Sequence, residues 1–236
     1  MESSASEKAG GSARGRREAL VRRAVRILDR LEATFPDARC ALDFTTPYEL
    51  LLATILSAQC TDERVNIVTG RLFPSVSGPK DVVAMGQAGL EAAIRDVGLF
   101  RSKAKSILEA SIRILRDHEG RVPSDRASLE ALPGVGPKTA SVVLSNAFGV
   151  PALAVDTHVF RVSHRLALSE ARTPEKTSED LRSLWPESRW IQAHHTLIFH
   201  GRQICHARNP ECVRCPVLDA CPEGRVRIRK AAHHPA

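Results

Sequence analysis

Residues 129–148 read LEALPGVGPKTASVVLSNAF, and in this stretch Leu-Pro-Gly-Val-Gly separates two helical patterns. Glycine lets the backbone turn tightly and brings main-chain N–H groups close to an external group, because it has no Cβ. The second helix is predicted to begin near Pro137, a favoured first-turn residue, so its free N–H groups point to the same place. The stretch therefore predicts a helical hairpin whose turn forms a phosphate-binding site.

This arrangement is the helix-hairpin-helix pattern, which grips the DNA backbone and does not read its sequence. We expect the contacts to come from the turn residues Leu132, Gly134, Val135 and Gly136. The alternative is an ordinary helical hairpin in which the glycines serve only a steric purpose.

The whole chain has helical periodicity, with apolar residues three and four positions apart and no convincing alternating strand pattern. The fold class is therefore predicted to be all-α, with two helical lobes and a cleft between them. Turns are expected at Thr46-Pro47, Ser77-Gly78-Pro79 and Pro133-Gly134. The predicted segments are a disordered basic arm (1–18), a six-helix bundle with the hairpin (41–150), a second lobe (19–40 with 151–225) and a basic tail (226–236).

The chain has 236 residues and a net charge of +7, and 43% of its residues are hydrophobic. No apolar run approaches the roughly 18 residues that a membrane span requires, so no membrane partner is expected. The positive charge is compatible with a polyanionic partner, but a solvated basic surface would give the same excess. Composition alone leaves a nucleic-acid partner open.

The first residues, MESSASEKAGGSARGRR, lack the apolar core of a secretory signal, and the acidic Glu2 and Glu7 argue against a transit peptide. Without an export signal, and with clustered cysteines, we expect reduced thiols in a reducing compartment. The expected location is the bacterial cytoplasm, in association with the nucleoid, or the nucleus or mitochondrion if the chain is eukaryotic.

Four cysteines near the C-terminus form a C-x6-C-x2-C-x5-C array: Cys205, Cys212, Cys215 and Cys221. Four thiolates can hold either a zinc ion or an iron-sulfur cluster. Structural zinc sites usually pair two CxxC-like knuckles, whereas this array has one, which favours a compact [4Fe-4S] cluster. Zinc and metal-free thiols stay open as alternatives. Cys40 and Cys60 lie outside the array and are expected to be buried small hydrophobic residues.

The loop HARNPE, between the first two cysteines of the array, contains His206 and Arg208. A cluster would fix this loop, and Arg208 could then contact DNA phosphate, with plain solvent exposure as the alternative. Three histidines on one predicted helix are interpreted as packing and hydrogen-bonding residues and not as metal ligands: His194, His195 and His200.

Lys138 lies in the first turn of the hairpin's second helix, where the positive end of the helix dipole disfavours the ammonium form. A lysine kept partly as the free amine can attack an electrophilic carbon and form a Schiff base. A lysine that only contacts phosphate is the commoner use beside such a hairpin, and charge does not separate the two.

Asp156, in Ala-Val-Asp-Thr-His-Val-Phe-Arg-Val, is predicted to cap a new helix. The N–H donors at a helix mouth keep such a carboxylate ionised. Facing Lys138 across a cleft, it could stabilise positive charge on a sugar ring or assist the deprotonation of a nucleophile. Capping alone is also a sufficient reason for an aspartate at this position.

The segments LPGVGPKTASVVL and AVDTHVFRV and the cysteine array together resemble the endonuclease III family of DNA glycosylases, over about residues 20–225. ILSAQCTDERVN and VGLFRSKAKSI are similar to two further segments of that family. In the family's pattern, Gln59 fills the gap left by an extruded base and Leu99 wedges into the base stack. Without the resemblance, both would be ordinary loop residues.

The resemblance implies a monomeric, bifunctional DNA glycosylase and AP lyase that acts on double-stranded DNA with oxidised pyrimidines or abasic sites. The damaged base is flipped from the duplex. Lys138 attacks C1′ and displaces the base while Asp156 stabilises the transition state, and β-elimination from the Schiff base cuts the strand on the 3′ side. The [4Fe-4S] cluster is implied as the cofactor.

This sequence departs from the family's pattern at two positions. Pro137 replaces a basic residue that many relatives have, and Cys60 replaces a common alanine. The adenine-specific branch of the superfamily is an alternative, but it lacks a lysine at the position of Lys138. A non-catalytic DNA-binding module is another, and only the pairing of Lys138 with Asp156 speaks against it. The terminal basic segments are interpreted as auxiliary electrostatic contacts, with no role as the alternative.

Overall fold

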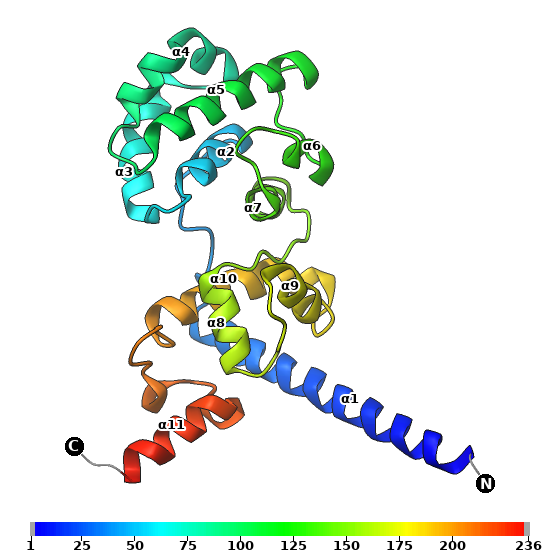
Figure 1. Cartoon of the computed structure of the whole chain (residues 1–236). Coiled ribbons are helices and arrows are strands. Elements are labelled where there is room, and N and C mark those ends of the chain that lie inside the picture. The colour runs from blue at the N-terminus through cyan, green and yellow to red at the C-terminus, as the bar shows by residue number, and fades with distance from the viewer. Residues whose placement is uncertain (1–2, 234–236) are drawn as a thin grey trace. The chain divides into compact units, whose positions relative to one another are not determined.

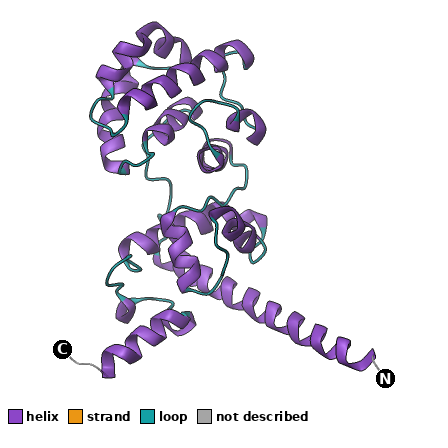
Figure 2. Ribbon diagram, viewed as in Figure 1, coloured by secondary structure: helices purple, strands orange, loops and turns teal. Residues whose placement is uncertain are grey.

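The computed structural model of the protein describes residues 3–233, with side chains from residue 14 to residue 232 (Figure 1). The regular elements within this range are all helical, as predicted (Figure 2). No helix among the described residues is long and apolar enough to cross a membrane. The chain divides into two compact units, Cys40–Ala152 and the combination of Met1–Arg39 with Leu153–Ala236.

The unit Cys40–Ala152, all of which is described, contains six α-helices. They are α2 (Pro47–Leu56), α3 (Asp62–Leu72), α4 (Pro79–Ala93), α5 (Phe100–Asp117), α6 (Arg126–Glu130) and α7 (Pro137–Phe148). Helix α4 packs along α5, and α2 packs against α7.

Local sequence sets where these helices begin. Thr46 caps α2 in a capping box, because its hydroxyl accepts from Glu49 N at 3.1 Å and the Glu49 carboxylate accepts from Thr46 N at 3.3 Å. Proline occupies the first position of α2, α4 and α7, where its missing N–H costs nothing. The three turns predicted from Pro and Gly are therefore confirmed.

Helix α2 is the centre of the core of this unit. Leu50, Leu51 and Leu56 are completely buried there, and they pack in one cluster with Ile107 and Ile114 of α5. Burial of each such side chain contributes about 1.5–3 kcal/mol. The hydroxyls of Tyr48 and Ser111 pair at 2.7 Å inside the core, which satisfies both polar groups.

The second unit is built from both ends of the chain. Its helices are α1 (Ser3–Thr34), α8 (Thr157–Arg165), α9 (Pro174–Arg182), α10 (Trp190–Gln203) and α11 (Pro222–His233). On α1, Ala24, Ile27, Leu28 and Leu31 form one fully buried stripe at helical spacing. Trp185 fixes this stripe by donating from Nε1 to Ala24 O at 3.1 Å.

The N-terminal segment differs from its predicted character. Residues 3–18, predicted as part of a disordered arm, belong to helix α1, and the predicted tail is helical as far as His233. The first α1 side chain that packs against the core is Leu20. Among the described side chains before it, Arg14 and Glu18 form an exposed ion pair at 3.1 Å, which adds at most about 0.5 kcal/mol. The ends of both predicted segments, residues 1–2 and 234–236, lie outside the described range.

Candidate functional site

The hairpin turn between α6 and α7 requires glycine at residue 134. Gly134 has a φ of +77°, and a Cβ there would lie 2.8 Å from Ser106 Cβ. Val135 N donates to Leu132 O at 3.1 Å and closes the turn. The side chains of Leu132 and Val135 are buried in the core, whereas Gly134 and Gly136 are exposed. Leu132 and Val135 therefore present only main-chain atoms to a ligand.

Helix α7 begins at Pro137, as predicted, and Lys138 is exposed in its first turn. Gly136 provides no side-chain cap and the first turn contains no acidic residue, so this helix end carries unneutralised positive charge. Arg126 of α6 donates to Ser141 Oγ of α7 at 3.0 Å and joins the two helices of the hairpin.

A second lysine of the same unit allows a direct comparison. Gly78-Pro79-Lys80 opens α4 with the same tripeptide that opens α7, and Lys80 is also exposed. At α4, however, the Asp81 carboxylate accepts from the N–H groups of Ser77 at 2.8 Å and of Gly78 at 3.1 Å. The start of α4 is thus neutralised by its own sequence, while the start of α7 is left open to an anion.

Asp156 caps α8, as predicted. Its Oδ1 accepts from His158 N at 2.9 Å and from Val159 N at 2.8 Å. Its Oδ2 lies 3.1 Å from His158 Nδ1, and only 11% of the side chain is exposed. The main chain just before Asp156 is also fixed, because His194 Nδ1 pairs with Ala154 O at 2.8 Å. The ring contact of His158 with the carboxylate was not predicted from sequence.

Gln59 and Leu99 are exposed residues on two loops of the unit Cys40–Ala152, and both have left-handed backbone conformations. Their φ angles are +54° and +58°. The loops are neighbours, since a Cβ on Gly98 would lie 4.0 Å from Gln59 O. Leu99 is 61% exposed, so its side chain is accessible to a ligand.

All four cysteines of the C-terminal array line one cavity, with Leu166, Leu218 and Gly224 beside them. Burial raises the pKa of Cys215 to about 11 and raises the pKa of Cys212 and Cys221, and the neighbouring thiols add to each rise. Within the described residues, no group of three or more His, Cys, Asp or Glu side chains could hold a metal ion. The four thiols therefore share one cavity.

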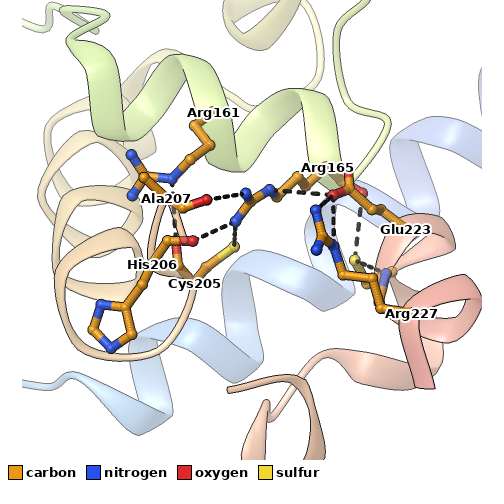
Figure 3. Close-up of polar contacts among 9 residues, drawn as sticks. Arg161, Arg165, Cys205, His206, Ala207, Glu223 and Arg227 are labelled. Atoms are coloured by element: carbon orange, nitrogen blue, oxygen red, sulfur yellow. Dashed lines mark hydrogen bonds and ion pairs between the residues drawn. The ribbon is translucent and has the colours of Figure 1, made fainter. Parts of the chain in front are cut away.

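Two arginines of α8 hold the segment that contains Cys205 (Figure 3). Arg165 donates to His206 O at 2.6 Å and to Ala207 O at 2.9 Å, and its Nη1 lies 3.4 Å from Cys205 Sγ. Arg161 donates to Cys205 O at 3.1 Å. These contacts order the start of the HARNPE loop, where Arg208 is exposed.

The three histidines of α10 are buried, as their interpretation as packing residues requires. Burial lowers the pKa of His195 to about 3 and that of His200 to about 4. His200 Nε2 also lies 3.8 Å from Cys215 Sγ, so this residue contacts the cysteine cavity. Cys40 and Cys60 are only partly buried and pack against the core of their unit.

The glycine turn before α7, with Lys138 in the first turn of that helix, has the helix-hairpin-helix arrangement expected from the sequence. Residues 52–187 match the family model of the HhH-GPD superfamily base excision DNA repair proteins. The chain belongs to the endonuclease III family within that superfamily. It is 47% identical to endonuclease III of Bacillus subtilis, over 86% of this chain and 93% of that protein.

A second relative and a solved structure agree with this assignment. Endonuclease III of Escherichia coli is 45% identical over 83% of this chain and 92% of that protein. The fold is similar to the structure of a trapped endonuclease III–DNA covalent intermediate, an estranged-adenine complex, with a TM-score of 0.85 and 45% identity. That match covers 89% of this chain and 99% of the solved chain.

Proposed function

We propose that this chain is a bifunctional DNA glycosylase and AP lyase that removes oxidised pyrimidines from duplex DNA, with Lys138 as the nucleophile. The observation that carries the proposal is the start of α7, where an exposed lysine lies in the first turn of a helix without an acidic cap. A phosphate of the DNA backbone would be held by the N–H groups of this turn and of the glycine hairpin.

The reaction follows from the chemistry of an amine at a sugar carbon. The Lys138 amine forms a bond to C1′, and the base leaves with the electrons of the glycosidic bond. Ring opening then gives a protonated Schiff base between lysine and sugar. Loss of a proton from C2′ expels the 3′ phosphate as the C3′–O bond breaks, which is the β-elimination step. Water finally hydrolyses the imine and releases the lysine.

We assign Asp156 to the stabilisation of positive charge on the sugar as the base departs. Its two N–H hydrogen bonds favour the ionised carboxylate and fix its position at the mouth of α8. The low exposure of this side chain supports the assignment, because charge interactions are stronger where water is excluded.

Cys205, Cys212, Cys215 and Cys221 would hold the [4Fe-4S] cluster. Their placement around one cavity is compatible with a shared metal cofactor, and the single CxxC of the array favours a cluster over zinc. With every thiolate used as a ligand, the bound cluster supplies a structural cross-link and no reactive centre for the sugar. Arg208, on the loop that leaves Cys205, would then face a DNA phosphate.

The relatives named above are bacterial, which supports action on chromosomal DNA in the bacterial cytoplasm. Gln59 and Leu99 would enter the duplex beside the extruded base. Their exposure and the neighbouring positions of their loops support this role.

Borohydride trapping on DNA with an abasic site tests the proposal, since reduction of the Schiff base leaves a stable protein–DNA adduct. Wild type should form the adduct and Lys138→Ala should not. Lys80→Ala is the matched control, because Lys80 has the same Gly-Pro-Lys context at a helix start and should be dispensable. Equal trapping by wild type and Lys138→Ala would refute the mechanism.

A further inference from the structure

The backbone at Gln59 and Leu99 needs support from its surroundings. A left-handed conformation costs roughly 1–2 kcal/mol for a residue with a Cβ, and such a conformation persists only where neighbouring structure fixes it. Both residues are exposed, so their side chains contribute little to holding these conformations. The support must come from buried groups behind the two loops.

One buried side chain, that of Lys103 on α5, connects the two loops. Its Nζ donates to Leu56 O at 2.8 Å, and Leu56 is the last residue of α2, three positions before Gln59. Its main-chain N donates to Leu99 O at 3.0 Å, in the first turn of α5. A single residue thus bonds the start of one loop through its side chain and the end of the other through its backbone.

The position of the ammonium explains why a lysine is stable there. The last carbonyls of a helix have no partner within it, and they carry the negative end of the helix dipole. Lys103 satisfies one of these carbonyls at α2 although the residue is only 5% exposed. Burial lowers the pKa of Lys103, and the neighbouring Cys60 acts in the opposite direction.

Burial of an ammonium is costly, and an apolar residue of similar volume would fill the same space without that cost. Core stability therefore gives no reason for a lysine at this position. The position of the bonded carbonyl gives a reason for a lysine, because Leu56 O lies where α2 ends and the turn Ser57–Cys60 begins. That turn is closed by Cys60 N, which donates to Ser57 O at 3.1 Å.

We propose that Lys103 is a positioning residue that holds the Gln59 loop and the Leu99 loop in fixed relation, so that both side chains enter the duplex together. This inference rests on the proposed function, in which those two side chains replace the extruded base. Lys103 does not touch the substrate. It acts through the end of α2 and the start of α5.

Lys103→Met tests the inference, because methionine retains most of the volume and loses the hydrogen bond. Lys105→Met is the matched control, since Lys105 lies on the same helix, is exposed and pairs with the exposed Glu109 at 3.9 Å. A duplex that carries 2-aminopurine next to the damaged base reports base extrusion by its fluorescence. We expect Lys103→Met to lower the extrusion signal and kcat/KM on damaged duplex by about tenfold or more. Lys105→Met should leave both unchanged.

Two further readouts separate positioning from general damage to the fold. Trapping on single-stranded abasic DNA needs no extrusion, so Lys103→Met should retain it within about twofold. In a double-mutant cycle, Lys103→Met should lower kcat/KM little further once Gln59→Ala has removed the inserted side chain. If Lys103→Met is unfolded by circular dichroism, Lys103→Gln replaces it, because its side chain stays polar but is one bond too short to reach Leu56 O. The same losses are then expected.

The outcomes distinguish the inference from the function on which it rests. Absence of trapping by the wild-type protein would refute the proposed function. Normal trapping by wild type together with normal extrusion by Lys103→Met, or additive losses in the cycle with Gln59→Ala, would overturn the positioning role alone.

Discussion

Arg165 Nη1 lies 3.4 Å from Cys205 Sγ, and the same guanidinium donates to His206 O at 2.6 Å and to Ala207 O at 2.9 Å (Figure 3). A single side chain of α8 therefore contacts both the first thiol of the array and the main chain that leaves it. Glu223 of α11 lies on the other side, 3.3 Å from Arg165 Nε. The guanidinium thus joins α8, the HARNPE loop and α11 within one unit.

Replacement of Arg165 by methionine should destabilise this end of the protein. The side chain is only 12% exposed, and the variant leaves the carbonyls of His206 and Ala207 without this donor. It also removes one of the two arginines that pair with Glu223, since Arg227 still donates to that carboxylate at 2.6 Å. We expect a loss of roughly 2–3 kcal/mol in the free energy of unfolding and less iron per chain. Urea unfolding and iron analysis measure the two effects. Arg229→Met is the control, because Arg229 is exposed and its bond to Arg225 O is long, at 3.4 Å.

Gly134→Ala should destabilise the hairpin turn. The added Cβ would meet Ser106 Cβ at 2.8 Å on a backbone with a φ of +77°, so steric overlap and backbone strain combine. A loss of about 2–4 kcal/mol is expected in the thermal unfolding of the protein. Gly136→Ala is the control for stability, because nothing lies within 4 Å of its Cβ position. Equal losses in the two variants would contradict this steric account.

Asp156→Asn separates helix capping from catalysis. Asparagine caps a helix about as well as aspartate, so the unfolding free energy should change by less than about 1 kcal/mol. Base removal should fall at least about tenfold, while the Kd for damaged duplex changes far less. Single-turnover kinetics and equilibrium binding measure these quantities. Asp125→Asn, at the cap of α6, is the matched control and should leave base removal intact. Parallel losses of affinity and rate in Asp156→Asn would favour a purely structural role.

Loss of the cluster should unfold the C-terminal segment before the hairpin unit. Val217 and Cys221 are buried in the core of their unit, and the cluster would join the loops around them. We expect a brown protein with broad visible absorbance that bleaches on chelation or oxidation. Limited proteolysis should then cut between Cys205 and Cys221 while residues 40–152 resist cleavage. A colourless protein with stoichiometric zinc would contradict the cluster assignment.

Stability should fall in mild acid because of His195. Burial lowers its pKa from 6.5 to about 3, so the unfolded chain binds a proton below pH 6.5 that the folded chain does not. Stability is therefore fully present above pH 6.5 and is lost as the pH falls toward 3. Linkage gives a loss of about 2 kcal/mol from His195 between pH 7 and pH 5. Urea unfolding at both pH values should show a smaller loss in His195→Gln. An equal loss in the variant would assign the acid sensitivity to other groups.

Local sequence predicted the features that depend on a few neighbouring residues. The start of α2 at Thr46-Pro47 and the cap of α8 at Asp156 follow from side-chain hydrogen bonds within one helical turn. Helix α7 begins at Pro137 because the fixed φ of proline suits the first position of a helix. The glycine turn before Lys138 is of the same kind. The order of the motifs also carried the resemblance to the endonuclease III family, which the relatives confirm.

Tertiary contacts decided the features that involve residues far apart in the chain. In the sequence, Lys103 has the pattern of an ordinary helix residue. The packing of α5 beside α2 brings its ammonium to Leu56 O, 47 positions away. Arg165 likewise reaches His206 across 41 positions. The helix starts named above and the family of this protein could therefore be predicted from local sequence. The supports behind the loops and the cysteine cavity depend on long-range packing, because a buried charge is stable only where the fold supplies its acceptor.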